Sequence, residues 1–197
     1  GMFLLMGCSD DDSTGPDTTG ANLVINEFLA KNDYNIVDEN GDHEDWIEIY
    51  NAGDEAIDIG GMYVTDNLEE LMTSQIPTTD PTLTTIEPGG YLILWADKEP
   101  EQGILHLDDV KLSAGGEQIG LTDTDGTTIL DSLTFVEQFA DISYGRVPDG
   151  EETWDYFGAG HASMPSPGAA NGSGDEPVVV FIINEFLASN RSEERRV

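Results

Sequence analysis

The chain has 197 residues and a formal net charge of −33 at pH 7, from 40 Asp and Glu against 7 Lys and Arg. This balance argues strongly against nucleic acid as a partner, because phosphate backbones are bound by Lys and Arg side chains that release counterions. An apolar share of 38% suits one sandwich-sized core with linkers. With a single cysteine, no disulfide can form within the chain.

The first 21 residues read as an anchor and a tether. A short apolar run ends in Gly7 directly before Cys8, which resembles a bacterial lipobox, where the cysteine carries a diacylglycerol. We therefore expect residues 1–8 to be a partial lipoprotein signal that binds the membrane through Cys8, at the outer membrane or surface of a bacterial cell envelope. Residues 9–20 contain no apolar residue, so residues 9–21 are predicted to be a disordered acidic tether.

From residue 22 to residue 157, short runs rich in Val, Ile, Leu, Tyr and Trp are cut by Gly, Pro, Asn and Asp, a pattern typical of an all-β fold. In Trp46–Tyr50, Ile47 and Ile49 share a face. The run Gly90–Asp97 is apolar on both faces, which predicts a central strand. The other predicted strands are 23–30, 61–65, 118–122, 128–136, 143–147 and 153–157. Seven or more such strands predict a two-sheet sandwich over residues 22–160.

Three turns connect these strands. Asp125-Gly126 suits a tight hairpin between two predicted strands, since glycine tolerates a positive φ. Pro88-Gly89-Gly90 marks a turn into the predicted central strand, and a third turn is expected at 148–150.

The region after residue 160 is predicted to link this module to a second one. Residues 161–177 are rich in Pro and Gly and read as a linker. Ile183–Asn190 then repeats Ile25–Asn32 at seven of eight positions, so residues 178–190 are predicted to be the first strand of a truncated second copy. Residues 191–197 hold three of the seven basic residues, and we interpret them as a sequence scar.

Several motifs occur together in order, at 25–30, 42–51, 53–59, 87–91, 143–146 and 166–171. In this combination the chain resembles a bacterial lamin-tail domain. The resemblance implies an immunoglobulin-like antiparallel β-sandwich of the kind found on secreted and surface proteins, often in tandem or beside hydrolytic or adhesive modules. It brings no catalytic residues. We therefore expect a non-catalytic binding or spacer module of a surface lipoprotein, with an unidentified protein or glycan ligand. The alternatives are an accessory domain of a larger secreted hydrolase and a calcium-stabilised adhesive repeat.

One loop carries candidate metal ligands. Asp38, Asn40 and Asp42 place oxygen atoms at alternate positions, and Asp45 follows, a set that a flexible loop could offer to Ca²⁺. The spacing is not that of an EF-hand, because the twelfth position is Ile49. The alternative is a solvated turn in which Asp and Asn side chains bond their own backbone. No other cofactor is expected.

The remaining polar and aromatic residues are expected to have structural roles. Asn26 is expected to bond a neighbouring turn, while Phe28 fills the core. The tryptophans, Trp46, Trp95 and Trp154, are expected in the core, with a platform for sugar rings as the alternative. Catalysis has little support, because the histidines at 43, 106 and 161 are scattered and no nucleophile elbow occurs.

Overall fold

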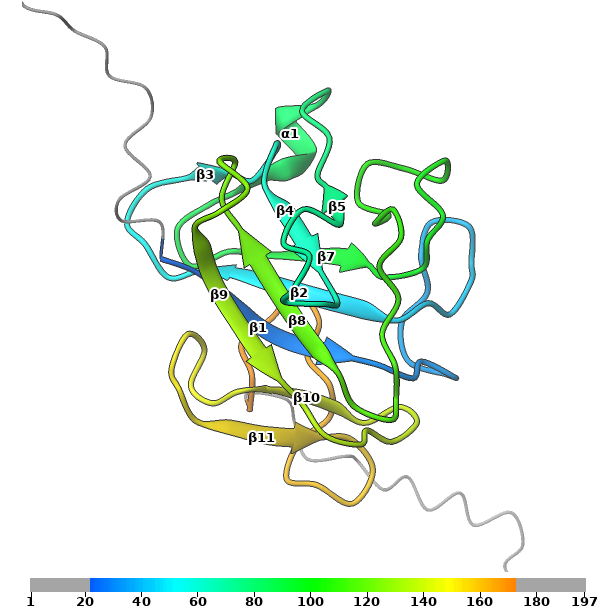
Figure 1. Cartoon of the computed structure of the whole chain (residues 1–197). Helices are drawn as coiled ribbons and strands as arrows, with labels where there is room; N and C mark the ends of the chain where they lie inside the picture. Colours follow the sequence, from blue (N-terminus) through cyan, green and yellow to red (C-terminus); the bar gives the residue numbers. More distant parts are fainter. Residues whose placement is uncertain (1–21, 173–197) are drawn as a thin grey trace, which may run out of the picture.

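The computed structural model describes residues 22–172, which fold into two packed layers of antiparallel strands (Figure 1). The strands are β1 (Leu23–Leu29), β2 (Trp46–Asn51), β3 (Ile57–Asp58), β4 (Tyr63–Thr65), β5 (Ser74–Gln75), β6 (Thr85–Ile86), β7 (Tyr91–Trp95), β8 (Gln118–Thr122), β9 (Ile129–Thr134), β10 (Ser143–Arg146) and β11 (Trp154–Phe157), with a four-residue helix, α1 (Pro81–Thr84). The prediction of an all-β, immunoglobulin-like antiparallel sandwich is confirmed. The predicted signal with Cys8, the tether, the second-copy strand and the scar lie outside the described residues.

One layer is a five-stranded sheet in the order β11-β10-β1-β2-β7, and the other is a four-stranded sheet in the order β5-β4-β8-β9. The strands β3 and β6 form a separate two-stranded sheet. All eight predicted strands are present. The two-residue strands β3, β5 and β6 and the helix α1 were not predicted, because two to four residues are too few to show a period. The predicted turns before β7, between β8 and β9, and between β10 and β11 are confirmed.

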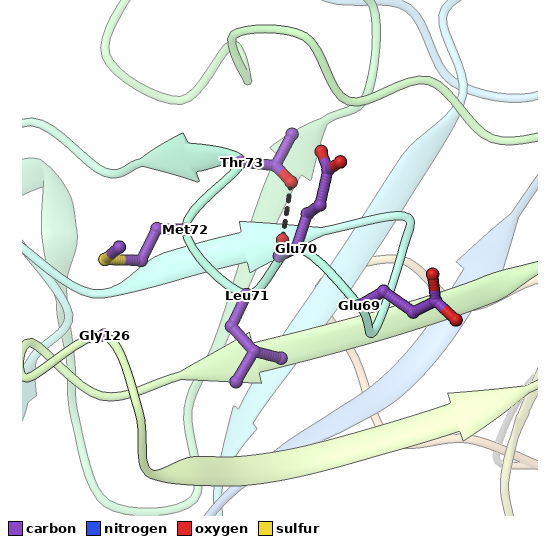
Figure 2. A pocket seen from close by; sticks show the side chains of 6 residues that line it. All are labelled: Glu69, Glu70, Leu71, Met72, Thr73 and Gly126. Atoms are coloured by element: carbon purple, nitrogen blue, oxygen red, sulfur yellow. Dashed lines mark hydrogen bonds between the residues drawn. The ribbon is translucent and has the colours of Figure 1, made fainter.

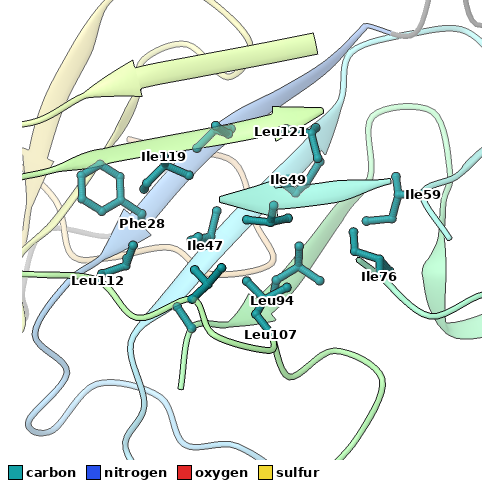
Figure 3. Close-up of a cluster of buried hydrophobic side chains, with 14 of the residues drawn as sticks. Phe28, Ile47, Ile49, Ile59, Ile76, Leu94, Leu107, Leu112, Ile119 and Leu121 are labelled. Carbon is teal, nitrogen blue, oxygen red and sulfur yellow. The ribbon is translucent and has the colours of Figure 1, made fainter. Parts of the chain in front are cut away.

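The core lies between the two sheets (Figure 3). Phe28 of β1 and Ile47 and Ile49 of β2 point from one layer toward Ile119 and Leu121 of β8 in the other, and all five are fully buried. Each such side chain stabilises the fold by about 1.5–3 kcal/mol. The strict alternation of inward and outward residues in β2 is what fixes its register in the sandwich.

The predicted central position of the strand at 90–97 is wrong. β7 is the edge strand of its sheet, pairing only with β2. It is apolar on both faces because other segments cover it. Trp95 N–H donates to Leu105 O and Leu107 N–H donates to Trp95 O, both at 2.8 Å, so residues 105–107 protect the end of this edge. On the outer face, Trp95 packs with Trp46 and Leu29 in a second apolar cluster.

A largely buried ion pair joins the two sheets. Arg146 of β10 lies 2.9 Å from the carboxylate of Asp131 on β9, and its Nε donates to Ile25 O at 2.8 Å. The same carboxylate accepts the N–H of Ile25 at 2.8 Å. The guanidinium also lies 4.8 Å from the centre of the Trp154 ring. Because each partner neutralises the other between the sheets, losing either one leaves a largely buried charge without its ion-pair partner.

The predicted boundary between sandwich and linker is also wrong. Residues 161–177 were predicted as a linker from Pro and Gly content, but Ser163 and Asn171 are buried against the domain. We call residues 163–171 the strap. The strap lies against the outer side of the five-stranded sheet and belongs to the domain, which therefore extends to Asn171. Residues 173–177 lie outside the described part of the chain.

Candidate functional site

The densest buried polar cluster in the described structure lies beneath the strap. Glu27 and Glu48 are direct cross-strand partners on β1 and β2, and both are fully buried. The pairing of β1 with β2 shifts by one residue between Ile25 and Glu27, which is a β-bulge at Asn26. We call Asn26, Glu27, Glu48, Asp149 and Asn171 the acid network.

The strap satisfies both glutamates with its backbone. The N–H of Ser166 lies 3.2 Å from Glu27 Oε1, and the Ser166 hydroxyl lies 3.2 Å from Glu27 Oε2. Ser143 of β10 also donates its hydroxyl to Glu27 Oε1. The N–H of Gly168 donates to Glu48 Oε2 at 2.6 Å. The carboxylates therefore act as acceptors that hold the strap to the sheet.

Asp149, in the turn between β10 and β11, is the third carboxylate. It accepts the Asn26 amide at 2.9 Å, the backbone N–H of Asn171 at 3.0 Å and the hydroxyl of Tyr91 at 2.7 Å. Asn26 also donates to Glu48 Oε1 at 2.9 Å and accepts the N–H of Gly150 at 3.1 Å. The prediction that Asn26 bonds a neighbouring turn is confirmed.

Asn171 closes the network on its far side. Its amide donates to Arg146 O at 2.9 Å and to Asn26 O at 3.2 Å, while its Oδ1 accepts the Ser166 hydroxyl at 2.8 Å. Gly145 lies directly beneath, and a Cβ there would approach Asn171 Nδ2 to 2.7 Å and Asn26 O to 2.9 Å. The absence of a side chain at Gly145 is therefore what lets Asn171 reach the sheet.

Burial shifts the ionisation of the two glutamates. It raises the pKa of Glu27 to about 7, against the lowering effect of the Ser143 and Ser166 donors. It raises the pKa of Glu48 to about 8, against the donors on Asn26 and Gly168. Within residues 22–172, no Lys or Arg side chain forms an ion pair with either glutamate or with Asp149. The two buried glutamates and the half-buried Asp149 are therefore bonded by N–H and O–H donors, without a cationic partner among the described residues.

The candidate calcium loop is organised by its own backbone. Asp38 Oδ1 accepts the N–H of Asn40 at 2.9 Å and that of Asp42 at 2.8 Å. Burial would raise the pKa of Asp38, but these donors outweigh it and the pKa is lowered. Asp45 points elsewhere and accepts the N–H of Asn32 at 3.2 Å, and burial raises its pKa to about 6. Among residues 22–172, no group of three or more His, Cys, Asp and Glu is arranged to hold a metal ion.

The three histidines contact different residues and do not form a cluster. His106 is buried, bonds Asp97 through Nδ1 and lies 3.2 Å from Glu39 through Nε2. Burial would lower its pKa, but the two carboxylates outweigh burial and the pKa is raised. His43 bonds Ile36 O, and His161 packs on Tyr156. Trp46 and Trp95 are buried as predicted, and Trp154 is half-buried against Tyr144 with ring centres 5.2 Å apart.

A surface hollow of about 400 Å³ lies on the loop before β5 (Figure 2). It is lined by Glu69, Glu70, Leu71, Met72, Thr73 and Gly126. In Figure 2 these side chains point in different directions, and the marked bond is the 2.8 Å contact that Thr73 makes with Glu70 O within the loop. The hollow therefore presents no convergent set of polar groups.

Sequence reasoning missed most of the acid network. Glu48 was visible only as the outward residue between Ile47 and Ile49, and Asp149 only as part of a turn. One signal was available, because the sequence Asn26-Glu27 recurs as Asn184-Glu185. A polar pair repeated inside an apolar strand motif indicates a buried contact.

Comparison with known families identifies a match. The model of the Lamin Tail Domain family matches residues 16–137. No curated protein and no solved structure gives a significant match. The matched region ends before β10, although β10 lies inside the five-stranded sheet, between β1 and β11. No helix among the described residues has the length and apolar character needed to cross a membrane.

Proposed function

The chain belongs to the lamin tail domain family, and we propose from this that it is a non-catalytic spacer module, displayed on a bacterial cell surface by a lipid at Cys8. Membership of an immunoglobulin-like family is consistent with a binding or spacer role. The fold alone does not select between the two roles, because unrelated functions occur on the same fold. The acid network favours the spacer.

A spacer has to keep the two ends of the module at a fixed distance from each other. The strap is the last described part of the chain, and the acid network bonds it to β1, β2 and the turn after β10. The C-terminal end of the described domain is therefore held at a fixed point next to Asn171. Because the three carboxylates are used in holding this exit, they are not free to act on a substrate.

Force spectroscopy tests the spacer role. If the strap is part of the load-bearing domain, pulling on both ends should release residues 22–171 in one step of about 500 Å, at about 3.4 Å per residue. Asn171→Ala should add an earlier step of about 30 Å as the strap peels away, by the same arithmetic. A wild-type trace that shows the short step first, at low force, would contradict the proposal, because the exit would then not be fixed.

The lipid anchor needs a separate test, since Cys8 lies outside the described residues. Cells expressing the full-length protein are labelled with a fatty-acid analogue, with Cys8→Ser as the control. We expect incorporation in the wild type alone, because the diacylglycerol on the Cys8 thiol would carry the labelled acyl chains. Two such chains give stable anchoring. Equal background labelling of both proteins would remove the anchor from the proposal and leave the spacer role standing.

A further inference from the structure

Two strands of the described fold sit at sheet edges with no neighbour on their outer side. β11 is the outermost strand of the five-stranded sheet, and β9 ends the four-stranded sheet (Figure 1). The opposite edges are protected differently, since residues 105–107 bond the end of β7 and β5 has only two residues. An unpaired edge is a template for pairing with another chain.

The hydrogen-bond alternation shows which groups of β11 face outward. Val147 N–H donates to Thr153 O at 2.8 Å, which places Thr153 in a hydrogen-bonded pair with the neighbouring strand. In an antiparallel ladder such pairs recur at every second residue, so Asp155 also bonds inward to β10. Trp154 and Tyr156 therefore direct their backbone N–H and C=O groups away from the sheet.

An aspartate covers one of these outward groups. The N–H of Tyr156 donates to Asp155 Oδ1 at 2.8 Å. The same device occurs on β9, where the outward N–H of Ser132 donates to Asp131 Oδ1 at 2.8 Å. Each carboxylate belongs to the residue directly before the exposed N–H. The Asp131 carboxylate also pairs with Arg146, whereas that of Asp155 is exposed at the edge of its sheet, where inserted charge is a common means of blocking strand addition.

We propose that β11 is a self-pairing edge that Asp155 keeps closed, and that the partner it fits is β11 of a second copy of this chain. An antiparallel copy centred on Asp155 places Trp154 opposite Tyr156 of the copy, and Tyr156 opposite Trp154. In both pairs, the backbone N–H and C=O groups that face away from the sheet would point toward those of the partner strand. The contact is self-complementary about a twofold axis, as closed dimers require.

The side chains fit this partner as well. Tyr144 already stacks on Trp154 with ring centres 5.2 Å apart and packs at a tilt against Tyr156 at 4.6 Å, so a second β11 would extend an existing row of aromatic side chains. Cross-strand aromatic pairs of this kind are favourable. What opposes pairing is Asp155 itself. It occupies the Tyr156 N–H, and its carboxylate would lie opposite that of the copy, with Cα atoms about 4.5 Å apart.

Two substitutions separate these effects. Asp155→Asn removes the charge but keeps an oxygen that accepts the Tyr156 N–H. Asp155→Ala removes both the charge and the acceptor. Glu152→Ala is the matched control, because Glu152 is an exposed acid just before β11 that accepts no edge N–H.

Sedimentation velocity of the full chain, at about 0.5 M salt to screen long-range repulsion between two acidic molecules, measures the outcome. We expect monomers for the wild type and Glu152→Ala, and dimerisation of Asp155→Ala at least tenfold tighter than that of Asp155→Asn. Amide exchange of Tyr156 should slow in the dimer. Tryptophan fluorescence confirms that each variant is folded. The proposal is overturned if folded Asp155→Ala stays monomeric at about 1 mM, if Glu152→Ala dimerises equally, or if the Tyr156 amide stays unprotected in the dimer.

Discussion

Raising the pH from about 5 to about 8.5 should weaken the folded domain through Glu27 and Glu48. Folding raises both pKa values, from 4.5 to about 7 and about 8, so the folded state favours the protonated carboxyls. Below pH 4.5 both groups are protonated in either state, and their contribution to stability is fully present. Above that pH the unfolded chain ionises first, and the stability is lost until the pH passes the folded pKa values.

The size of the loss follows from the shift. One pKa unit corresponds to about 1.4 kcal/mol, so Glu48 alone accounts for a loss of about 5 kcal/mol between pH 4.5 and pH 8. Glu27 adds to this loss, but the two losses do not simply add, because burial raises both pKa values and repulsion from Glu27 is a smaller part of the raised pKa of Glu48. Other acids whose pKa is raised, such as the half-buried Asp45, act in the same direction. A single substitution is therefore needed to separate the contribution of Glu48 from those of the other acids.

Glu48→Gln removes the ionisable group at this position and nothing else that titrates. The amide oxygen still accepts from Asn26, but the NH₂ group then faces the N–H of Gly168, and one lost hydrogen bond costs about 1 kcal/mol. Urea unfolding followed by tryptophan fluorescence should therefore find the variant less stable than the wild type at about pH 5 and more stable at about pH 8.5. Glu152→Gln removes the same charge from an exposed position. The reasoning is refuted if the wild-type and Glu48→Gln curves run parallel across this range, or if Glu152→Gln reproduces the crossing.

Four further outcomes are expected. Arg146→Met should destabilise the domain by about 3–5 kcal/mol in urea unfolding, because the largely buried Asp131 carboxylate would lose its ion-pair partner, and adding Asp131→Leu should recover part of the loss. Gly145→Ala should lower the melting temperature, since the new methyl group would overlap Asn171 and cost about 1–3 kcal/mol. Asn171→Ala should cost about 1–3 kcal/mol through two unsatisfied carbonyls, measured in the same way. Adding millimolar Ca²⁺ should leave the melting temperature unchanged, because the Asp38 carboxylate already accepts two backbone N–H groups; a rise would restore the metal site.

The sequence predicts the position of residues in strands where apolar and polar side chains alternate. Ile47 and Ile49 point to the core as their spacing requires, and Asp125-Gly126 forms the hairpin. The edge position of β7 was not predictable, because residues 105–107 bond its edge and Ile36 and Leu105 pack against its outer apolar cluster, and all of these come from outside the strand.

The site was hidden for a related reason. Pro165 and Gly168 in the strap are typical of a linker, and nothing local indicates that Ser166 and Gly168 donate their N–H groups to glutamates more than 100 residues earlier. Glu48 likewise has the position of an exposed residue on a half-buried strand. Only the tertiary fold, which lays the strap over β1 and β2, turns two surface glutamates into buried ones.

Amide hydrogen exchange at Ser166 and Gly168 tests most directly whether the strap belongs to the domain. If the acid network holds the strap as described, both amides should exchange only through global unfolding, at rates matching a core amide such as that of Ile47, and both should become faster in Asn171→Ala. Exchange of Ser166 and Gly168 at the rate of an unstructured peptide, while Ile47 stays protected, would contradict the account, because the exit of the chain would then be free of the sandwich.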